Sequence, residues 1–423
     1  MNHPLVDEAL ELAVTALSTD DQHGGTAVRP TYIRHKPGQS TVIAVEVTSG
    51  PSVAHGYVMR YEDPARARVA FAKAGTRRMQ DTPLGAGVRM LGGSAVLRLM
   101  PNDARLGRLR WYTDTRKIKR SLASLTDAGD LISGKASNVT VLRYKPERRL
   151  VAHVAATTVS GARHDWLLRY TARPGAQQLA NIAKRIADAG VTTPSTVATL
   201  EDDRVSIDQF LAGVQLFDLL VGAEQTPLSP PVDLAERLAH LHSIQSPTTP
   251  TARHAHADLN KTCGGLQVLS NWSHSFAEPG LRLARALGRR VPDDVYCPTL
   301  IHGDLHLKNV MATADGYAFV DLERAQPGRP ETDLGTLVAQ SISAAVRPGR
   351  SSALADFCAA TVDAYSGRHA LDQQSLRWWT SVALAEQALL TARHLEPEWE
   401  QTVAQLLELA IDHADAPAAR VGR

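Results

Sequence analysis

Residues 299–333 read TLIHGDLHLKNVMATADGYAFVDLERAQPGRPETD and contain the most specific motif of the chain. An apolar strand, TLI, leads into the tripeptide HGD, whose last residue is Asp304. Asn309 follows, and a hairpin that turns at the dipeptide DG then presents Asp321. The spacing therefore predicts that three side chains able to handle a proton or a metal ion converge on one hairpin.

Side chains of these types suit the transfer of a phosphoryl group. Such a transfer needs a divalent metal ion to neutralise the phosphates and a carboxylate to orient the attacking hydroxyl. Magnesium prefers hard oxygen ligands, which an Asn carbonyl and an Asp carboxylate supply. We therefore expect Asp304, together with His302, to form the catalytic site, and Asn309 and Asp321 to bind Mg2+.

HGDLHLKN followed by FVDLE resembles the catalytic and metal-binding loops of the aminoglycoside phosphotransferase and choline kinase-like family. The resemblance implies a bilobal protein-kinase-like fold that uses ATP and Mg2+. It places the catalytic carboxylate on Asp304 and the metal ligands on Asn309 and Asp321. ETDLG resembles the acidic turn that follows the metal loop in this family, where Asp333 would brace the catalytic loop.

Two further segments resemble parts of the same fold. Residues 234–243, LAERLAHLHS, resemble the helix that family members place before the catalytic strand. SIDQFLAG resembles the hinge between the lobes. Because backbone groups of the hinge bind adenine in this fold, the resemblance implies that role for Gln209, Phe210 and Leu211.

The expected phosphate-binding residues depart from the protein-kinase pattern. No GxGxxG loop is present, and the turn KPERR stands in its place, so Lys145 and Arg148 are expected to contact the phosphates. Arg169 lies on the third strand, where a phosphate-binding lysine is usual. A guanidinium binds phosphate through two parallel hydrogen bonds, so the substitution keeps the role. The helix after it has no obvious Glu to pair with Arg169; Gln177 and Gln178 are the nearest polar candidates.

The chain also contains an internal repeat, because residues 31–61 resemble residues 140–170 at one constant offset. The matching pairs are Arg34 and Arg143, Lys36 and Lys145, Pro37 and Pro146, His55 and His164, Tyr57 and Trp166, Arg60 and Arg169, and Tyr61 and Tyr170. Each copy predicts three strands and a helix, a βββα unit. The first copy is interpreted as an N-terminal cap, an arrangement that resembles bacterial maltokinases and glucosamine kinases.

These features predict an α+β chain with three domains. The cap is expected over residues 1–125, a nucleotide-binding N-lobe with a small antiparallel sheet over 126–212, and a mostly helical catalytic C-lobe over 213–423. Within the C-lobe, residues 244–299 are rich in Pro, Thr, Ser and His, and we interpret them as a variable insertion with a helix near LRLARALGRR.

The composition of the chain excludes several classes of protein. With 423 residues, 43% of them hydrophobic, it can bury large cores. The N-terminus carries acidic residues where a signal peptide carries basic ones, and no stretch approaches the roughly 18 apolar residues of a membrane helix. Three distant cysteines without a CxxC pair argue against disulfides and zinc. We expect a soluble cytoplasmic protein without a membrane partner.

Charge is unevenly distributed along the chain. Basic residues predominate in residues 1–215 and acidic ones in residues 216–423, which would suit an anionic nucleotide and a cationic substrate, respectively. A basic run over residues 105–120 contains Trp111 and Tyr112 and has the composition of a nucleic-acid patch. We interpret this run as a solvated face and expect no nucleic-acid partner.

Three functions remain for such a chain. The first is a kinase for a hydroxyl of a sugar, aminosugar or aminoglycoside-like small molecule. The alternative is a kinase for Ser/Thr hydroxyls of a biosynthetic precursor peptide, ahead of β-elimination by another enzyme. The third is a nucleotide-binding scaffold without turnover, against which the intact set of Asp304, Asn309 and Asp321 argues. The sequence leaves the first two open.

Overall fold

The computed structural model describes residues 6–18, 26–75, 80–126, 130–200, 202–222, 228–245, 253–293, 299–347 and 352–416. Its contacts divide the chain into two compact units. Unit 1 contains residues 1–180, 196–210 and 393–395, and unit 2 contains the rest. A boundary between them falls after Phe210, and the division into three domains stays a prediction.

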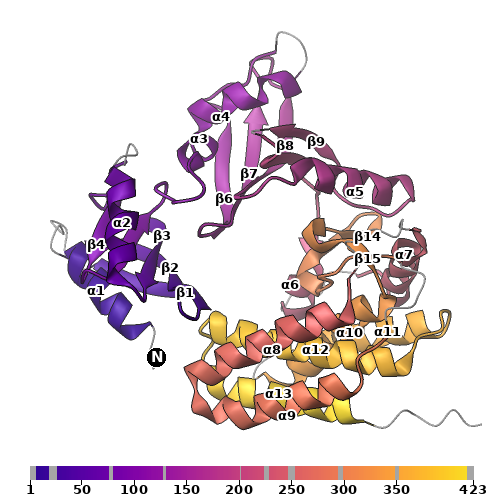
Figure 1. The fold of residues 1–423 in the computed structure, drawn as a ribbon. Coiled ribbons are helices and arrows are strands. Elements are labelled where there is room, and N and C mark those ends of the chain that lie inside the picture. The colour runs from indigo at the N-terminus through magenta and orange to yellow at the C-terminus, as the bar shows by residue number, and fades with distance from the viewer. Residues whose placement is uncertain are drawn as a thin grey trace, which may run out of the picture. The chain divides into compact units, whose positions relative to one another are not determined.

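The first sheet of unit 1 is an antiparallel, five-stranded sheet in the order β1-β2-β3-β5-β4 (Figure 1). Its strands are β1 (Thr26–Lys36), β2 (Ser40–Ser49), β3 (Ser52–Tyr61), β4 (Val88–Leu91) and β5 (Ala95–Leu99). Two helices pack against it, α1 (Asp7–Ser18) and α2 (Pro64–Gly75). Strand β3 is the central strand, and in the neighbouring strand β2 the residues from Thr41 to Val45 are all buried.

The second sheet of unit 1 has the order β6-β7-β8-β10-β9. Its strands are β6 (Asn138–Lys145), β7 (Arg149–Thr157), β8 (Arg163–Thr171), β9 (Thr196–Leu200) and β10 (Val205–Gln209), and α5 (Ala176–Asp188) follows β8. Every second residue of β7 from Leu150 to Ala156 is buried, which is the period expected of a strand with one covered face.

The predicted repeat is confirmed, and it extends further than the sequence indicated. Both copies form three antiparallel strands followed by a helix, as expected. Both then add two more strands, which join the sheet beside the third strand in the same order. The sequence comparison covered only the βββα part of each copy, so the two added strands extend the repeat beyond the predicted unit.

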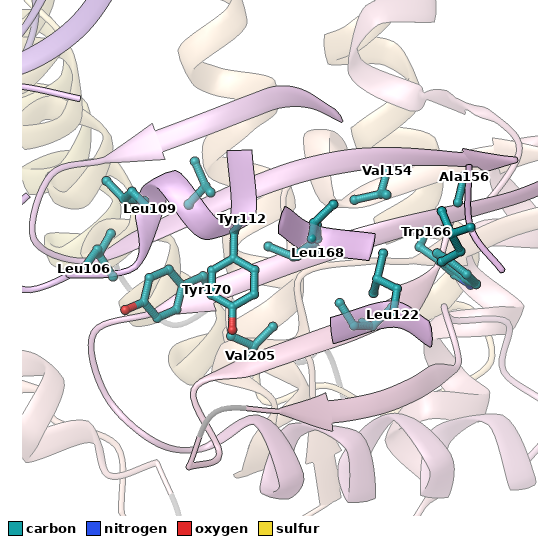
Figure 2. Packing of buried hydrophobic residues seen from close by; sticks show 14 residues of the cluster. Leu106, Leu109, Tyr112, Leu122, Val154, Ala156, Trp166, Leu168, Tyr170 and Val205 are labelled. Carbon is teal, nitrogen blue, oxygen red and sulfur yellow. The ribbon is translucent and has the colours of Figure 1, made fainter. Parts of the chain in front are cut away.

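The segment between the two sheets covers one face of the second sheet. It forms α3 (Leu109–Thr113) and α4 (Thr115–Leu122), whose apolar side chains enter the core of that sheet (Figure 2). Tyr112 packs against Tyr170 of β8, with ring centroids 5.1 Å apart. The basic residues that the sequence shows in this segment therefore alternate with residues that bury a hydrophobic face.

Unit 2 contains two small sheets, to which residues 299–328 contribute most of the strands. Strand β12 (Thr299–Ile301) pairs with β15 (Gln326–Gly328). Strands β13 (Val310–Thr313) and β14 (Gly316–Phe319) form the predicted hairpin, and β11 (Val214–Gln215) pairs with β13.

Helices make up the remainder of unit 2, as predicted for the C-terminal part of the chain. They are α6 (Leu216–Val221), α7 (Pro231–Ser243), α8 (Ala255–Trp272), α9 (Ala277–Arg289), α10 (Pro330–Val346), α11 (Ser352–Ser366), α12 (Gln373–Arg393) and α13 (Trp399–Asp415). Helix α9 contains the predicted LRLARALGRR, whereas α8 was missed, because its weak amphipathic pattern includes Gly264 and Gly265.

No helix in these described ranges has both the length and the apolar composition needed to cross a bilayer. Cys263 and Cys358 are free thiols, and Cys297 lies outside the described residues. The mixed architecture, with antiparallel sheets followed by a helical part, confirms the predicted α+β protein-kinase-like fold with a repeated N-terminal unit.

Candidate active site

Strand β12 delivers the predicted catalytic loop, and His302 anchors it. Its side chain is fully buried, and Nε2 donates a hydrogen bond to the carbonyl oxygen of Val320 at 2.9 Å. The ring also lies edge-on to Phe319, the last residue of β14. The ring thus connects the start of the predicted catalytic loop to the strand that leads to Asp321. The His302 side chain is buried and is not exposed to a substrate.

Asp333, in the first turn of α10, binds the backbone of the same loop. Its two carboxylate oxygens accept the amide N–H groups of His302 at 2.7 Å and of Gly303 at 2.9 Å. His242 of α7 lies 3.2 Å from the same carboxylate, and its other ring nitrogen contacts the Tyr365 hydroxyl at 2.9 Å. Burial alone would raise the pKa of Asp333, but the His242 and His302 contacts lower it. Asp333 therefore stays an acceptor that fixes the loop.

Gly303 is required by the geometry of this loop. Its φ is +74°, and a Cβ atom there would lie 2.2 Å from the carbonyl oxygen of Arg324. The carbonyl oxygen of Gly303 accepts a hydrogen bond from Arg253 at 2.8 Å. The peptide units around Gly303 are therefore held by Asp333 on one side and by Arg253 on the other.

Asp304, Asn309 and Asp321 lie together around the start of the hairpin. The Asn309 amide nitrogen donates to the Asp304 carbonyl oxygen at 3.0 Å, and the Val320 amide donates to the Asn309 carbonyl oxygen at 3.0 Å. Burial lowers the pKa of His306, whereas the nearby carboxylates of Asp304 and Asp321 act in the opposite direction. The His306 ring therefore lies within electrostatic range of both carboxylates.

The residues present fit a magnesium ion. Asn309 uses its side-chain nitrogen within the loop, which leaves the amide oxygen as the donor atom that Mg2+ prefers. Asp321 has φ +59°, a left-handed conformation that is uncommon for a residue other than glycine and is often found at functional positions. No group of three or more His, Cys, Asp or Glu side chains in the described ranges is arranged to hold a metal. A metal here would therefore depend on these two residues together with phosphate oxygens and water.

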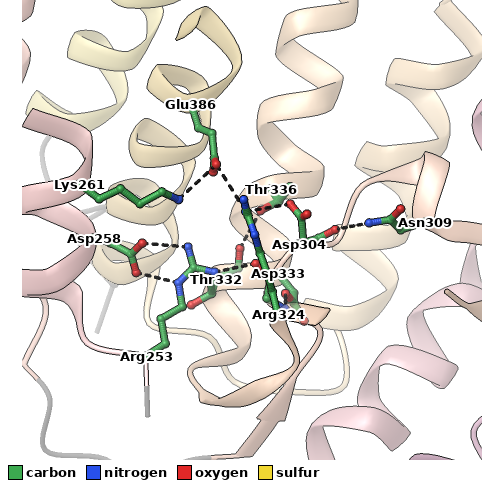
Figure 3. Close-up of polar contacts among 11 residues, drawn as sticks. Arg253, Asp258, Lys261, Asp304, Asn309, Arg324, Thr332, Asp333, Thr336 and Glu386 are labelled. Atoms are coloured by element: carbon green, nitrogen blue, oxygen red, sulfur yellow. Dashed lines mark hydrogen bonds and ion pairs between the residues drawn. The ribbon is translucent and has the colours of Figure 1, made fainter. Parts of the chain in front are cut away.

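A network of alternating charges surrounds the Asp304 carboxylate (Figure 3). Arg324 lies 3.2 Å from Asp304 and 3.4 Å from Glu386 of α12, and Lys261 of α8 lies 3.2 Å from Glu386. Burial would raise the pKa of Glu386, but Lys261 and Arg324 bring it down to about 2. Burial lowers the pKa of Arg324, yet Asp304 and Glu386 give it a net rise. Arg324 and Glu386 therefore stay charged at neutral pH.

The sequence analysis missed this network. Arg324 lies three residues after Asp321, so its position in the sequence could have indicated that it lies near the site. Glu386 and Lys261 come from two distant helices and carry no local signal. The same holds for Arg253, which forms an ion pair with Asp258 at 2.7 Å and lies over the Trp379 ring at 5.1 Å.

The expected phosphate-binding arginine lies in unit 1. Arg169 of β8 is 8% exposed, and it pairs in register with Ser206 of β10. Burial raises the pKa of Asp208 on the same strand, while hydrogen bonding by Thr196 and the charge of Arg169 lower it. Asp208 of β10 is therefore the acidic neighbour of Arg169. The sequence analysis had looked for such a neighbour on the helix that follows β8. Gln177 of that helix accepts a hydrogen bond from Thr199 at 3.0 Å.

The remaining nucleotide-binding candidates of unit 1 lie at strand ends. Lys145 ends β6 and Arg148 follows it in the turn, where the Arg148 amide donates to the Lys145 carbonyl oxygen at 3.0 Å. Gln209 ends β10, and the Phe210 amide donates to the Asp165 carbonyl oxygen at 3.0 Å.

The predicted hinge is divided between the units, since Leu211 belongs to unit 2. Phe210 is 37% exposed, and its ring lies 4.3 Å from the ring of His153. Leu211 is partly buried and opens the link to β11.

The chain is similar to several solved structures at low sequence identity, and three of them follow. A choline/ethanolamine kinase family protein from Mesorhizobium loti is 17% identical, with a TM-score of 0.44 over 72% of this chain and 96% of that one. A spectinomycin phosphotransferase solved with ADP and spectinomycin is 13% identical, with a TM-score of 0.48 over 70% and 98%. A macrolide 2'-phosphotransferase from Brachybacterium faecium is 18% identical, with a TM-score of 0.41 over 73% and 99%.

A comparison with curated proteins found no match. The model of the phosphotransferase enzyme family, APH, matches residues 130–371, which is more than half of the chain. The matched range contains the second sheet of unit 1, the loop that carries Asp304 and the β13–β14 hairpin. The chain therefore belongs to the phosphotransferase enzyme family.

Proposed function

We propose that this chain transfers the γ-phosphate of ATP to a hydroxyl group of a small molecule, such as a sugar, an aminosugar or an aminoglycoside-like compound, in the cytoplasm. Membership of the phosphotransferase family supports the reaction class. One observation carries the proposal. The candidate catalytic carboxylate and both candidate metal ligands lie on one short segment, whose backbone is fixed by buried Asp333.

Asp304 would act on the acceptor. Its carboxylate would accept the proton of the hydroxyl while the hydroxyl oxygen forms a bond to the γ-phosphorus and the bond from that phosphorus to the bridging oxygen of ADP breaks. Arg324 contacts this carboxylate and would orient it before the acceptor arrives. Asn309 and Asp321 would hold Mg2+, which supplies positive charge for the phosphates when it is bound.

The nucleotide would depend on residues of the second sheet and of the predicted hinge. Arg169, Lys145 and Arg148 would contact the phosphates, and backbone groups of Gln209, Phe210 and Leu211 would contact adenine. The burial of Arg169 beside Asp208 supports its role, because a cation held in one orientation binds phosphate without first losing side-chain freedom.

The surroundings of Asp304 support a polar acceptor. Arg324, Glu386 and Lys261 present both signs of charge within one ion-pair network, and each is partly accessible to solvent. An amino group on the acceptor would bind Glu386 in competition with Lys261. A hydroxyl-rich acceptor would hydrogen-bond with the same side chains.

The direct test is turnover of the full chain with ATP and Mg2+ against a panel of acceptors. We expect ADP release that depends on one class of sugar, aminosugar or aminoglycoside, with a phosphorylated product in mass spectrometry. Asp315→Asn is a matched control for changes in Asp304, because Asp315 is exposed at the turn of the same hairpin. This variant should turn over at the wild-type rate.

Two results would contradict the proposal. Turnover only with Ser-rich or Thr-rich peptides would replace the small-molecule acceptor by a peptide. ATP binding without turnover, together with no phosphorylated product from any acceptor, would favour the scaffold without activity.

A further inference from the structure

The turn between β6 and β7 has an unusual conformation at Glu147. Its φ is +56°, in the left-handed region that residues other than glycine seldom adopt. The first copy of the repeat has Gly38, with φ +70°, at the equivalent position. The two turns are otherwise alike, because the Arg148 amide bonds to the Lys145 carbonyl oxygen as Gln39 bonds to that of Lys36. Something outside the turn must hold Glu147 in this conformation.

Asp103, in the loop after β5, supplies one set of contacts. Its side chain is 5% exposed. Oδ2 accepts the Glu147 amide N–H at 2.8 Å and the Tyr144 hydroxyl at 2.7 Å. Oδ1 accepts the amide N–H groups of Arg105 at 2.7 Å and Leu106 at 2.8 Å. One oxygen thus binds the turn, and the other is fixed by its own loop.

The first sheet supplies a second set of contacts, to the side chain of Glu147. Tyr57 of β3 donates to its Oε1 at 3.4 Å, and Arg34 of β1 lies 3.8 Å from Oε2. The Tyr57 hydroxyl also accepts the Ala104 amide N–H at 3.1 Å. Burial and the nearby Asp103 carboxylate raise the pKa of Glu147, while Arg34 opposes them. The turn is therefore held at its backbone and at its side chain by the first copy of the repeat.

We propose that Asp103 is a positioning residue for nucleotide binding, which holds the 145–149 turn in the conformation that receives the phosphates of ATP. This inference rests on the proposed function, in which Lys145 and Arg148 contact those phosphates. A glycine-rich loop approaches phosphates with its own amides, whereas this turn would present side chains whose positions depend on its backbone. Asp103 fixes that backbone, so ATP would not lose affinity to ordering of the turn.

This inference gives the first copy of the repeat a role, although that copy has no catalytic lobe of its own. Its first sheet and the loop after it would complete the phosphate site of the second copy. The contacts come from strands β1 and β3 and from the loop that contains Asp103, all within unit 1.

The test uses Asp103→Asn in the full chain. The variant has one acceptor oxygen in place of two, so its side chain can no longer accept from both the turn and its own loop. We expect the dissociation constant of MgATP to rise at least about tenfold, which corresponds to about 1.4 kcal/mol. Adenosine has no phosphates, so its dissociation constant should stay within about twofold of the wild-type value, which corresponds to about 0.4 kcal/mol.

Asp63→Asn is the matched control, because Asp63 is an exposed residue of the same repeat whose carboxylate accepts the Ala65 amide N–H at 2.8 Å. Its affinities for MgATP and adenosine should equal those of the wild type. Hydrogen exchange provides a second readout. The amide of Glu147 should exchange faster in Asp103→Asn, and MgATP should slow exchange over residues 145–149 in the wild type.

An unchanged MgATP affinity in Asp103→Asn would overturn the inference, as would an equal loss of MgATP and adenosine binding. If that variant does not fold, Tyr144→Phe decides, since it removes one donor to Asp103 and should weaken MgATP alone. No effect of Tyr144→Phe would then overturn the inference. Wild-type protein that binds MgATP without protection of residues 145–149 would overturn the inference alone. Wild-type protein that binds no MgATP would overturn the proposed function as well.

Discussion

Arg324 contacts the carboxylate of Asp304 at 3.2 Å and that of Glu386 at 3.4 Å, and it thereby connects the candidate catalytic residue to helix α12. The side chains of Arg324 and Asp304 are 42% and 32% exposed, so a substrate can reach both. The pair stands where a hydroxyl acceptor would lose its proton.

Asp304→Asn should remove most phosphoryl transfer and leave nucleotide binding intact. The amide has the shape of the carboxylate but cannot accept the hydroxyl proton, a contribution of about 10²–10⁴-fold to the rate. Steady-state kcat and the dissociation constant of MgATP, measured on the same preparation, check this expectation. A near-normal kcat would remove Asp304 from the catalytic role, whereas the exposed control Asp315→Asn should behave as wild type.

Arg324→Gln should reduce kcat/KM for the acceptor by about twofold to fivefold, because a partly exposed ion pair contributes only about 0.5–1 kcal/mol. The mutation leaves Asp304 without its orienting cation and Glu386 with Lys261 alone. Arg368→Gln is a suitable control, since Arg368 pairs with Glu236 at the surface. Acceptor kinetics unchanged by Arg324→Gln would show that Asp304 is oriented by the loop without this contact.

Glu386→Gln should lower the free energy of unfolding in a pH-dependent way. The folded state holds the pKa of Glu386 at about 2, below its usual 4.5, so the charged form stabilises the fold above the usual pKa. This contribution is lost as the pH falls toward about 2. The difference between wild type and variant in urea unfolding should therefore be largest near neutral pH and shrink steadily below about pH 5.

Glu408→Gln serves as the comparison for that experiment. Glu408 pairs with Arg282 at 3.0 Å, and both side chains are nearly half exposed. A surface pair of this kind stabilises by at most about 1 kcal/mol. A pH-independent difference for Glu386→Gln, or one as small as that for Glu408→Gln, would contradict the strong ion pairing of Glu386.

Gly303→Ala should destabilise the protein by about 2–4 kcal/mol, because the residue has positive φ and the new methyl group overlaps a carbonyl oxygen. Gly264→Ala in α8 should have the opposite sign. A Cβ there meets no atom within 4 Å, and Ala in a helix is more stable than Gly by about 0.5–1 kcal/mol. Thermal unfolding of both variants tests the pair, and a stable, active Gly303→Ala protein would show that the loop has a different conformation.

The sequence alone was sufficient for the features that depend on neighbouring residues. The HGD tripeptide, the hairpin and the spacing from Asp304 to Asp321 are local, since strand and turn preferences act over a few residues. The repeat could also be recognised from the sequence, because similar residues occur at a constant offset in the two βββα units. These features predicted the fold class and the phosphotransferase family.

Tertiary structure alone decided which distant groups reach the site. Arg324 contacts Asp304 and Glu386 only because α12 and the catalytic loop pack in one core, and Lys261 arrives on a helix that the sequence did not predict. Asp103 meets Glu147 across more than forty intervening positions. Such contacts depend on burial and on the placement of whole elements, which local sequence patterns do not determine. The candidate catalytic residues, by contrast, are close together in the sequence and could be identified from it.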